Sequence, residues 1–162
     1  EAVYVRVKGV SDVESGYSNG QASQPSYEAV CTGRTGCNEV VKLVYDADQV
    51  STLELLEIFF LIHDPTSLNR QGNDTGTQYR SGIYWTSPHQ QTVAQDLIRE
   101  MSQDKHFGVP VVTEVLPLTN YWPAEDYHQD FFEKNPDQGY CMAVAAPKVA
   151  KFRRTFARLV KD

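Results

Sequence analysis

The feature that most constrains this chain is a long polar segment, His63 to Arg80, which lies between two strongly apolar stretches. Its residues follow neither the period of an amphipathic helix nor the alternation of a strand. Connections of this length are uncommon inside a compact domain unless they bind a ligand, cover a site or are disordered. The segment mixes Asp, Tyr, Arg and Gln and has only two glycines, which is unlike a flexible linker. We therefore expect it to form the wall of a pocket.

Composition excludes several classes of protein. The net charge of −6 disfavours a nucleic-acid partner or an acidic membrane surface. No apolar run approaches the roughly 18–20 residues of a membrane span, so we expect a soluble protein without a membrane partner. A chain of 162 residues is most simply one domain.

The cysteines and histidines do not have the spacing of a metal site or of a disulfide framework. Cys31, Cys37 and Cys141 are an odd number of widely separated thiols, and the four histidines are scattered. We expect free or catalytic thiols in a reducing compartment, with no metal and no organic cofactor. The expected location is the cytoplasm, and an organelle stays open because no targeting segment can be judged from this sequence.

Hydrophobic patterns predict alternating strands and helices. We expect strands over 10–15, 40–45, 81–85 and 111–116, and helices over 51–62, 87–103, 124–134 and 147–161. The run 40–45 is apolar at successive positions, which indicates a strand buried on both faces. Residues 16–36 read as a polar connection. This alternation is typical of an α/β or α+β sandwich.

Two local patterns are more specific. Ser51 and Glu54 form a capping-box pattern, and the helix that follows has an expected buried stripe of Leu53, Leu56, Phe59 and Phe60. The valines at positions 3, 5 and 7 alternate as in a strand, although the resemblance described next favours a helix there.

Six blocks of residues carry a resemblance to a known family. They are the segment ending in Gln78-Tyr79-Arg80, Gly16-Tyr17, Pro25-Ser26-Tyr27, Thr35-Gly36-Cys37-Asn38-Glu39-Val40, Ala124-Glu125-Asp126-Tyr127-His128-Gln129 and Gly139-Tyr140-Cys141. Their order and approximate spacing resemble peptide methionine sulfoxide reductase A, from Glu1 to about Lys148. The resemblance implies an α/β (α+β) two-layer sandwich with a ferredoxin-like core, to which helices and long loops are added.

The resemblance also implies a nucleophile that these residues do not contain. In the family the nucleophilic cysteine lies in a Gly-Cys-Phe-Trp motif, which is absent from the 162 residues and is expected a residue or two ahead of Glu1. We therefore expect residues 1–162 to form a single domain of this type that lacks its first strand and the start of its first helix. The alternative is a binding or structural module that keeps the methionine sulfoxide pocket without the nucleophile.

Glu39 is the first candidate catalytic residue. It directly precedes the apolar pair Val40-Val41, so its carboxyl group enters the environment of a buried strand. A carboxyl group in an apolar site has a raised pKa and can stay protonated near neutrality. By resemblance it protonates the sulfoxide oxygen during attack on sulfur. The alternative is an acid at the strand edge that faces water.

Three further candidates lie in polar loops. Tyr27 and Tyr79 match family positions whose hydroxyl groups point at the sulfoxide oxygen, and the alternative is that they are packing residues. Asp74 matches a residue that orients a water or the tyrosines, and the alternative is an ordinary Asx-turn.

The family resemblance assigns the remaining thiols and the partners. Cys141 matches a resolving cysteine, which attacks the sulfenic acid and leaves a disulfide that thioredoxin reduces; the alternative is an inert packed thiol. Cys31 reads as a structural thiol and His128 as a structural helix residue. Cys37 replaces a common family histidine, which leaves a substitute nucleophile as an alternative. The implied activity is reduction of methionine S-sulfoxide, free or in oxidised proteins, by a monomer that uses thioredoxin.

Overall fold

The computed structural model describes residues 1–162, which divide into two compact units. Unit 1 consists of Glu1–Gly16, Val41–Ile62 and Pro123–Asp162, and unit 2 consists of Tyr17–Val40 and His63–Trp122. That residues 1–162 act as a single domain stays a prediction.

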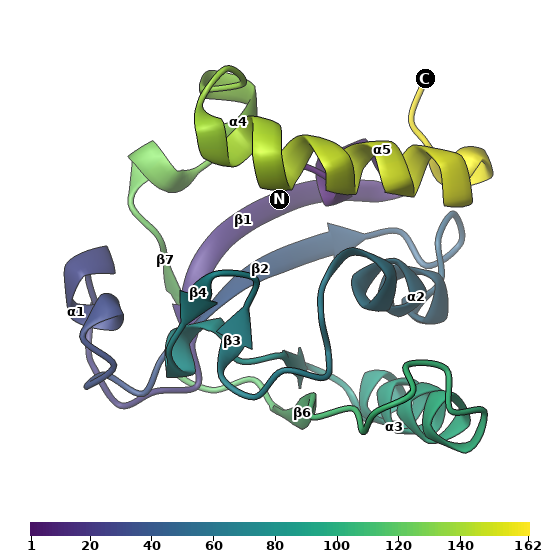
Figure 1. Cartoon of the computed structure of the whole chain (residues 1–162), viewed down its shortest axis with the longest axis horizontal. Coiled ribbons are helices and arrows are strands. Elements are labelled where there is room, and N and C mark those ends of the chain that lie inside the picture. Colours follow the sequence, from purple (N-terminus) through teal and green to yellow (C-terminus); the bar gives the residue numbers. More distant parts are fainter. The chain divides into compact units, whose positions relative to one another are not determined.

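Helices and strands alternate along the chain, which confirms the predicted mixed α/β class (Figure 1). The strands are β1 (Val10–Ser18), β2 (Asn38–Tyr45), β3 (Arg70–Gln71), β4 (Asp74–Thr75), β5 (Gly82–Trp85), β6 (Glu114–Pro117) and β7 (Trp122–Pro123). The α-helices are α1 (Tyr27–Cys31), α2 (Thr52–Ile62), α3 (Pro88–Gln103), α4 (Phe131–Lys134) and α5 (Ala146–Thr155). Short 3₁₀ turns are η1 (Tyr4–Arg6), η2 (Thr77–Tyr79), η3 (Asp126–His128) and η5 (Ala157–Leu159), and η4 (Cys141–Ala145) is a π-helical turn.

The strands form three small sheets. One has the order β2-β1-β7, with the long strands β1 and β2 side by side in Figure 1. β3 and β4 pair antiparallel as a hairpin, whereas β5 and β6 pair in parallel. Within unit 2, α3 packs against both β5 and β6.

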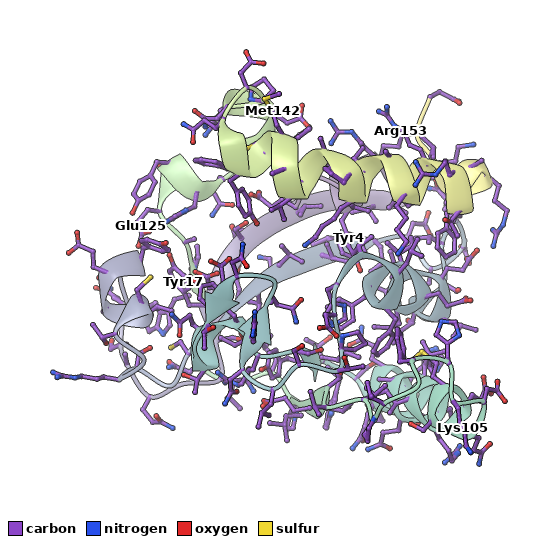
Figure 2. All side chains as sticks on the ribbon, viewed as in Figure 1. Tyr4, Tyr17, Lys105, Glu125, Met142 and Arg153 are labelled. Carbon is purple, nitrogen blue, oxygen red and sulfur yellow. The ribbon has the colours of Figure 1, made fainter.

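Unit 1 holds the main hydrophobic core. Helices α2 and α5 pack together there, and the hydroxyl group of Tyr4, labelled in Figure 2, donates to the Leu55 carbonyl oxygen at 3.0 Å. The buried members are Val3, Tyr4, Val7, Val10, Val50, Leu55, Ile58, Val149, Phe152 and Leu159. Residues from both ends of the chain therefore share one core, and Val7 forms a bridge with Val160.

Helix α2 begins as predicted, and its buried side agrees only in part with the predicted one. The Glu54 carboxylate accepts from the Ser51 amide at 3.0 Å and the Ser51 hydroxyl accepts from the Glu54 amide at 3.0 Å, which confirms the capping box. The buried residues are Leu55, Ile58 and Phe60, while Leu53 is 44% exposed. Phe60 was correctly predicted to be buried, whereas Leu53 was not. The helix is apolar on nearly every side, so its period does not single out one face.

The expectation that β2 is buried on both faces was also wrong. Lys42 and Val44 are exposed, whereas Val41, Leu43 and Tyr45 pack against the core of unit 1. Alternate side chains point to opposite faces of a strand, so only one face of β2 meets the core.

Other predicted boundaries shift. The valine pattern at the start of the chain contains the 3₁₀ turn η1, so the helical interpretation was the closer one. Ser87 caps α3 by accepting from the Gln90 amide at 3.4 Å, and Pro88 is its first residue, as predicted. β6 begins at Glu114 rather than at 111. The expected helix over 124–134 is two short turns, and the last helix ends at Thr155, followed by η5.

Candidate active site

Four of the five sequence-predicted site residues belong to unit 2. Glu39 is the second residue of β2, Tyr27 the first of α1, Tyr79 the last of η2, and Asp74 the first of β4. The fifth, Cys141, belongs to unit 1, where it begins the π-helical turn η4. The site is therefore built from the unit 2 residues.

A short helix that sequence reasoning missed positions Tyr27. The Ser26 hydroxyl caps α1 by accepting from the Ala29 amide at 3.1 Å. The signal was present as Pro25-Ser26 ahead of the helix, but five residues are too few for a hydrophobic period to show. Tyr27 and Cys31 are four residues apart, so they share one face of α1.

The polar segment is an ordered hairpin followed by a turn. Gln71 pairs with Asp74 across β3 and β4, and the Gly76 amide donates to the Asn69 carbonyl oxygen at 2.8 Å. Gly76 has φ +147°, and a Cβ atom there would collide with the Gln78 side chain. This glycine therefore lets the chain pass directly from Asp74 into the turn that ends at Tyr79.

Burial and a neighbouring charge prepare Glu39 to hold a proton. Burial of the carboxyl group, and secondly the charge of Asp74, raise the pKa of Glu39 to about 7. Near neutral pH roughly half of the Glu39 carboxyl groups are then protonated. A carboxyl group of this kind is suited to act as a general acid.

The two tyrosines lie in the same electrostatic environment. A hydrogen bond with the Cys31 thiol, burial, and the charges of Cys31, Tyr79 and Glu39 raise the pKa of the Tyr27 hydroxyl. Burial, and then the charges of Glu39, Cys31 and Asp74, raise the pKa of Tyr79, against the effect of its hydrogen bond with Tyr27. Both phenols therefore stay protonated near neutrality as hydrogen-bond donors. Each of the four predicted residues Tyr27, Glu39, Asp74 and Tyr79 interacts with at least one of the others, so the four lie close together.

Cys31 lies beside the predicted site, which the sequence interpretation did not anticipate. It is exposed, and its thiol forms a hydrogen bond with the Tyr27 hydroxyl. The expectation of a structural thiol stays a prediction. The four-residue spacing from Tyr27 was the available signal, which depends on recognising α1 as a helix.

The other cysteines are buried. Cys37 is 1% exposed, and a Cβ atom on Gly20 would collide with its amide and its sulfur, which describes a closely packed thiol. Cys141 is 0% exposed, while its neighbours Tyr140 and Met142 are 55% and 61% exposed. Met142 is labelled in Figure 2. The resolving role of Cys141 and the substitute role of Cys37 stay predictions.

His128 and Gln129 lie within unit 1. The His128 ring is 3.4 Å from the Glu125 carboxylate and contacts the Tyr127 ring. The Gln129 side chain accepts from the Ser15 amide and donates to the Ser15 carbonyl oxygen, both at 2.9 Å. These contacts hold the segment after β7 to β1 and agree with a structural interpretation of His128.

The unit 2 site offers an acid and two hydroxyl donors. No group of three or more His, Cys, Asp or Glu side chains is arranged to hold a metal ion. No helix combines the length and the apolar character needed to cross a membrane. An acid beside two fixed O–H donors is suited to a substrate oxygen that gains negative charge and then a proton.

Comparisons with known proteins agree with this chemistry. The family model described as peptide methionine sulfoxide reductase matches residues 1–159. Peptide methionine sulfoxide reductase MsrA of Polynucleobacter asymbioticus is 52% identical over 160 residues, which are 99% of this chain and 84% of that protein. The MsrA of Saccharolobus solfataricus is 52% identical over 161 residues, covering 99% of this chain and 90% of that protein.

Solved structures share the fold as well. Reduced Mxr1 from Saccharomyces cerevisiae has a TM-score of 0.77 and 36% identity, covering 82% of this chain and 76% of that chain. Methionine sulfoxide reductase A of Corynebacterium diphtheriae has a TM-score of 0.74 and 40% identity, covering 79% of this chain and 65% of that chain. With identity near one half along its whole length, this chain belongs to the peptide methionine sulfoxide reductase MsrA family.

Proposed function

We propose that the unit 2 site binds methionine S-sulfoxide through its oxygen and reduces it. Membership of the MsrA family makes the chain a peptide-methionine (S)-S-oxide reductase. The observation that carries the proposal is the grouping of Glu39, Tyr27, Tyr79 and Asp74, in which the pKa of Glu39 is raised to about 7.

In the proposed first step a cysteine thiolate attacks the sulfoxide sulfur while Glu39 gives its proton to the sulfoxide oxygen. The sulfur–oxygen bond of the substrate breaks, the oxygen passes to the cysteine, and methionine leaves. Methionine sulfur gains two electrons and the cysteine is oxidised to a sulfenic acid. The attacking cysteine is the one in the family's Gly-Cys-Phe-Trp motif.

The hydroxyl groups of Tyr27 and Tyr79 stabilise the negative charge that develops on the sulfoxide oxygen. Two O–H donors fixed before the substrate arrives lower the barrier because they need no rearrangement during the reaction. Asp74 orients them and, in addition to the larger effect of burial, its charge raises the pKa of Glu39.

Cys141 is the proposed resolving thiol. Its sulfur attacks the sulfenic acid, a disulfide forms, and water leaves with the substrate's oxygen. Thioredoxin then supplies two electrons and two protons to restore both thiols. We further propose that the enzyme acts on free and protein-bound substrates as a monomer in the cytoplasm. Residues 1–162 form a single domain with a ferredoxin-like, two-layer core in this proposal.

The test uses the chain extended at its start by the family's Gly-Cys-Phe-Trp motif. Methionine S-sulfoxide is reduced in the presence of dithiothreitol, and kcat is compared between wild type and Glu39→Gln. An acid catalyst typically contributes ~10²–10⁴-fold, so a loss of that size supports the role of Glu39. The matched control is Glu100→Gln, an exposed acid on α3, which should keep wild-type kcat. Near-wild-type turnover by Glu39→Gln would remove the proposed acid.

A further inference from the structure

Arg80 directly follows Tyr79 and ties several separate segments of unit 2 together. Its guanidinium group donates to three carbonyl oxygens, those of Thr77 (2.8 Å), Gly36 (3.0 Å) and Asn19 (3.4 Å). The third nitrogen, Nε, donates to Glu114 Oε1 at 3.1 Å. The Arg80 side chain is only 15% exposed. Every nitrogen of the planar group is therefore engaged, in a geometry that a lysine amine does not reproduce.

The Glu114 carboxylate continues the connection toward Glu39. Its second oxygen accepts from the Tyr84 hydroxyl at 3.0 Å. The same Tyr84 oxygen accepts from Asn38 Nδ2 at 2.9 Å. Asn38 is 2% exposed and immediately precedes Glu39 in β2.

A further hydrogen bond joins Asn38 directly to Arg80. Asn38 Nδ2 also donates to the backbone carbonyl oxygen of Arg80 at 2.9 Å. Arg80 thus lies next to one proposed catalytic residue and Asn38 next to the other, with Glu114 and Tyr84 between them.

We propose that Arg80, Glu114, Tyr84 and Asn38 are a positioning network that sets the Glu39 carboxyl group and the Tyr79 hydroxyl group at the spacing needed for one sulfoxide oxygen. None of the four is a catalytic residue, because each acts through its neighbour. The inference rests on the proposed function of Glu39 and Tyr79.

Two physical arguments favour positioning over simple stabilisation. A partly buried ion pair such as Arg80–Glu114 adds little net stability because desolvation offsets the attraction. A misplacement of about 1 Å at a reacting group, by contrast, costs roughly 100-fold in rate. Arg80 contacts Gly36, just before β2, and Asn38, the first residue of β2. It also contacts Thr77, which lies in the same turn as Tyr79.

Tyr84→Phe is the mildest test, because it removes one oxygen and keeps the ring. In the motif-extended chain we expect kcat to fall roughly 10- to 100-fold, with KM within about twofold. The matched control is Tyr45→Phe, which removes a hydroxyl that lies 2.6 Å from the Thr52 hydroxyl in unit 1. The control should keep wild-type kcat. Wild-type kcat in Tyr84→Phe overturns the network.

Arg80→Lys keeps the charge and loses the fork of donors. We expect a similar fall in kcat, whereas Arg158→Lys, which alters an ion pair with Glu54 at 2.6 Å, should not change kcat. If Arg80→Lys fails to fold by circular dichroism, Tyr84→Phe alone decides the question.

A double-mutant cycle separates positioning from general structural damage. If Tyr84 acts partly through Glu39, Tyr84→Phe should lower kcat by a smaller factor in a Glu39→Gln background than in wild type. Independent, additive losses would overturn the positioning role. An active Glu39→Gln enzyme instead defeats the proposed function itself, so the two failures are distinguishable.

Discussion

Glu39 should make the protein less stable as pH rises, and Glu39→Gln should remove that effect. Burial, then the charge of Asp74, raise the pKa of Glu39 from 4.5 to about 7 in the folded chain. The folded state therefore binds the proton more tightly than the unfolded state between these two pH values. Stability that is present below pH ~4.5 is lost as pH rises through ~7.

The size of the effect follows from the difference in pKa. Roughly 2.5 pH units at about 1.36 kcal/mol each give an upper bound of about 3.4 kcal/mol. Because Glu39 is only partly buried and solvent screens its charge, we expect roughly 1–2 kcal/mol. Glu39→Gln should match wild type near pH 4 and exceed it by that amount above pH 8.

Urea unfolding of residues 1–162 followed by circular dichroism measures this difference, and it does not require the nucleophile. The free energy of unfolding is compared for wild type, Glu39→Gln and the exposed control Glu100→Gln at pH 4, 6, 7 and 8.5. If wild type and Glu39→Gln keep a constant difference in stability across this range, the raised pKa of Glu39 is refuted. Agreement between wild type and Glu100→Gln would exclude a general effect of removing one negative charge.

Three further outcomes follow from the same site. In the motif-extended chain, Asp74→Asn should lower the pKa of Glu39, so the fall of kcat at high pH should move to lower pH. An unchanged dependence of kcat on pH would exclude coupling of the two carboxyl groups. Tyr79→Phe should lower kcat by ~10- to 100-fold with little change in melting temperature, since it removes a donor to the developing charge; an unchanged kcat argues for a packing role. The Cys141→Ser variant should form one equivalent of methionine in a rapid-quench experiment and then stop turning over, even when thioredoxin is present. Its sulfenic acid should be trapped by dimedone. Sustained turnover would show that another thiol attacks the sulfenic acid.

Sequence signals that act within a few residues predicted the fold best. The Ser51 and Glu54 capping box and the Ser87-Pro88 start of α3 both appear as expected. The buried side of α2 and the exposed face of β2 were not predicted, because they depend on what packs against elements that are apolar on most sides. Likewise, the π-helical turn at Cys141 has no periodic signature.

The candidate site was predictable to a different degree. Family motifs named Glu39 and Tyr79, but they did not indicate the side chains that hold them. Cys31 became visible only once α1 placed it on the same face as Tyr27. Arg80 and Glu114 are 34 residues apart in sequence, so nothing local in the chain indicates that they pair.

Two residues next to the proposed catalytic residues lower the stability of the folded chain, because each has a buried oxygen without a hydrogen-bond partner. The side-chain oxygens of Asn38 and Gln78 are buried without a hydrogen-bond partner in the protein, and these residues directly precede Glu39 and Tyr79. A buried polar group left unpaired costs about 1–3 kcal/mol. Such a cost is tolerated where neighbouring contacts over-determine the conformation. The Asn38 amide nitrogen has two such contacts, with Arg80 and Tyr84. Local stability is thus reduced where a fixed geometry is needed, which is the pattern expected when side chains are positioned in advance for a substrate oxygen.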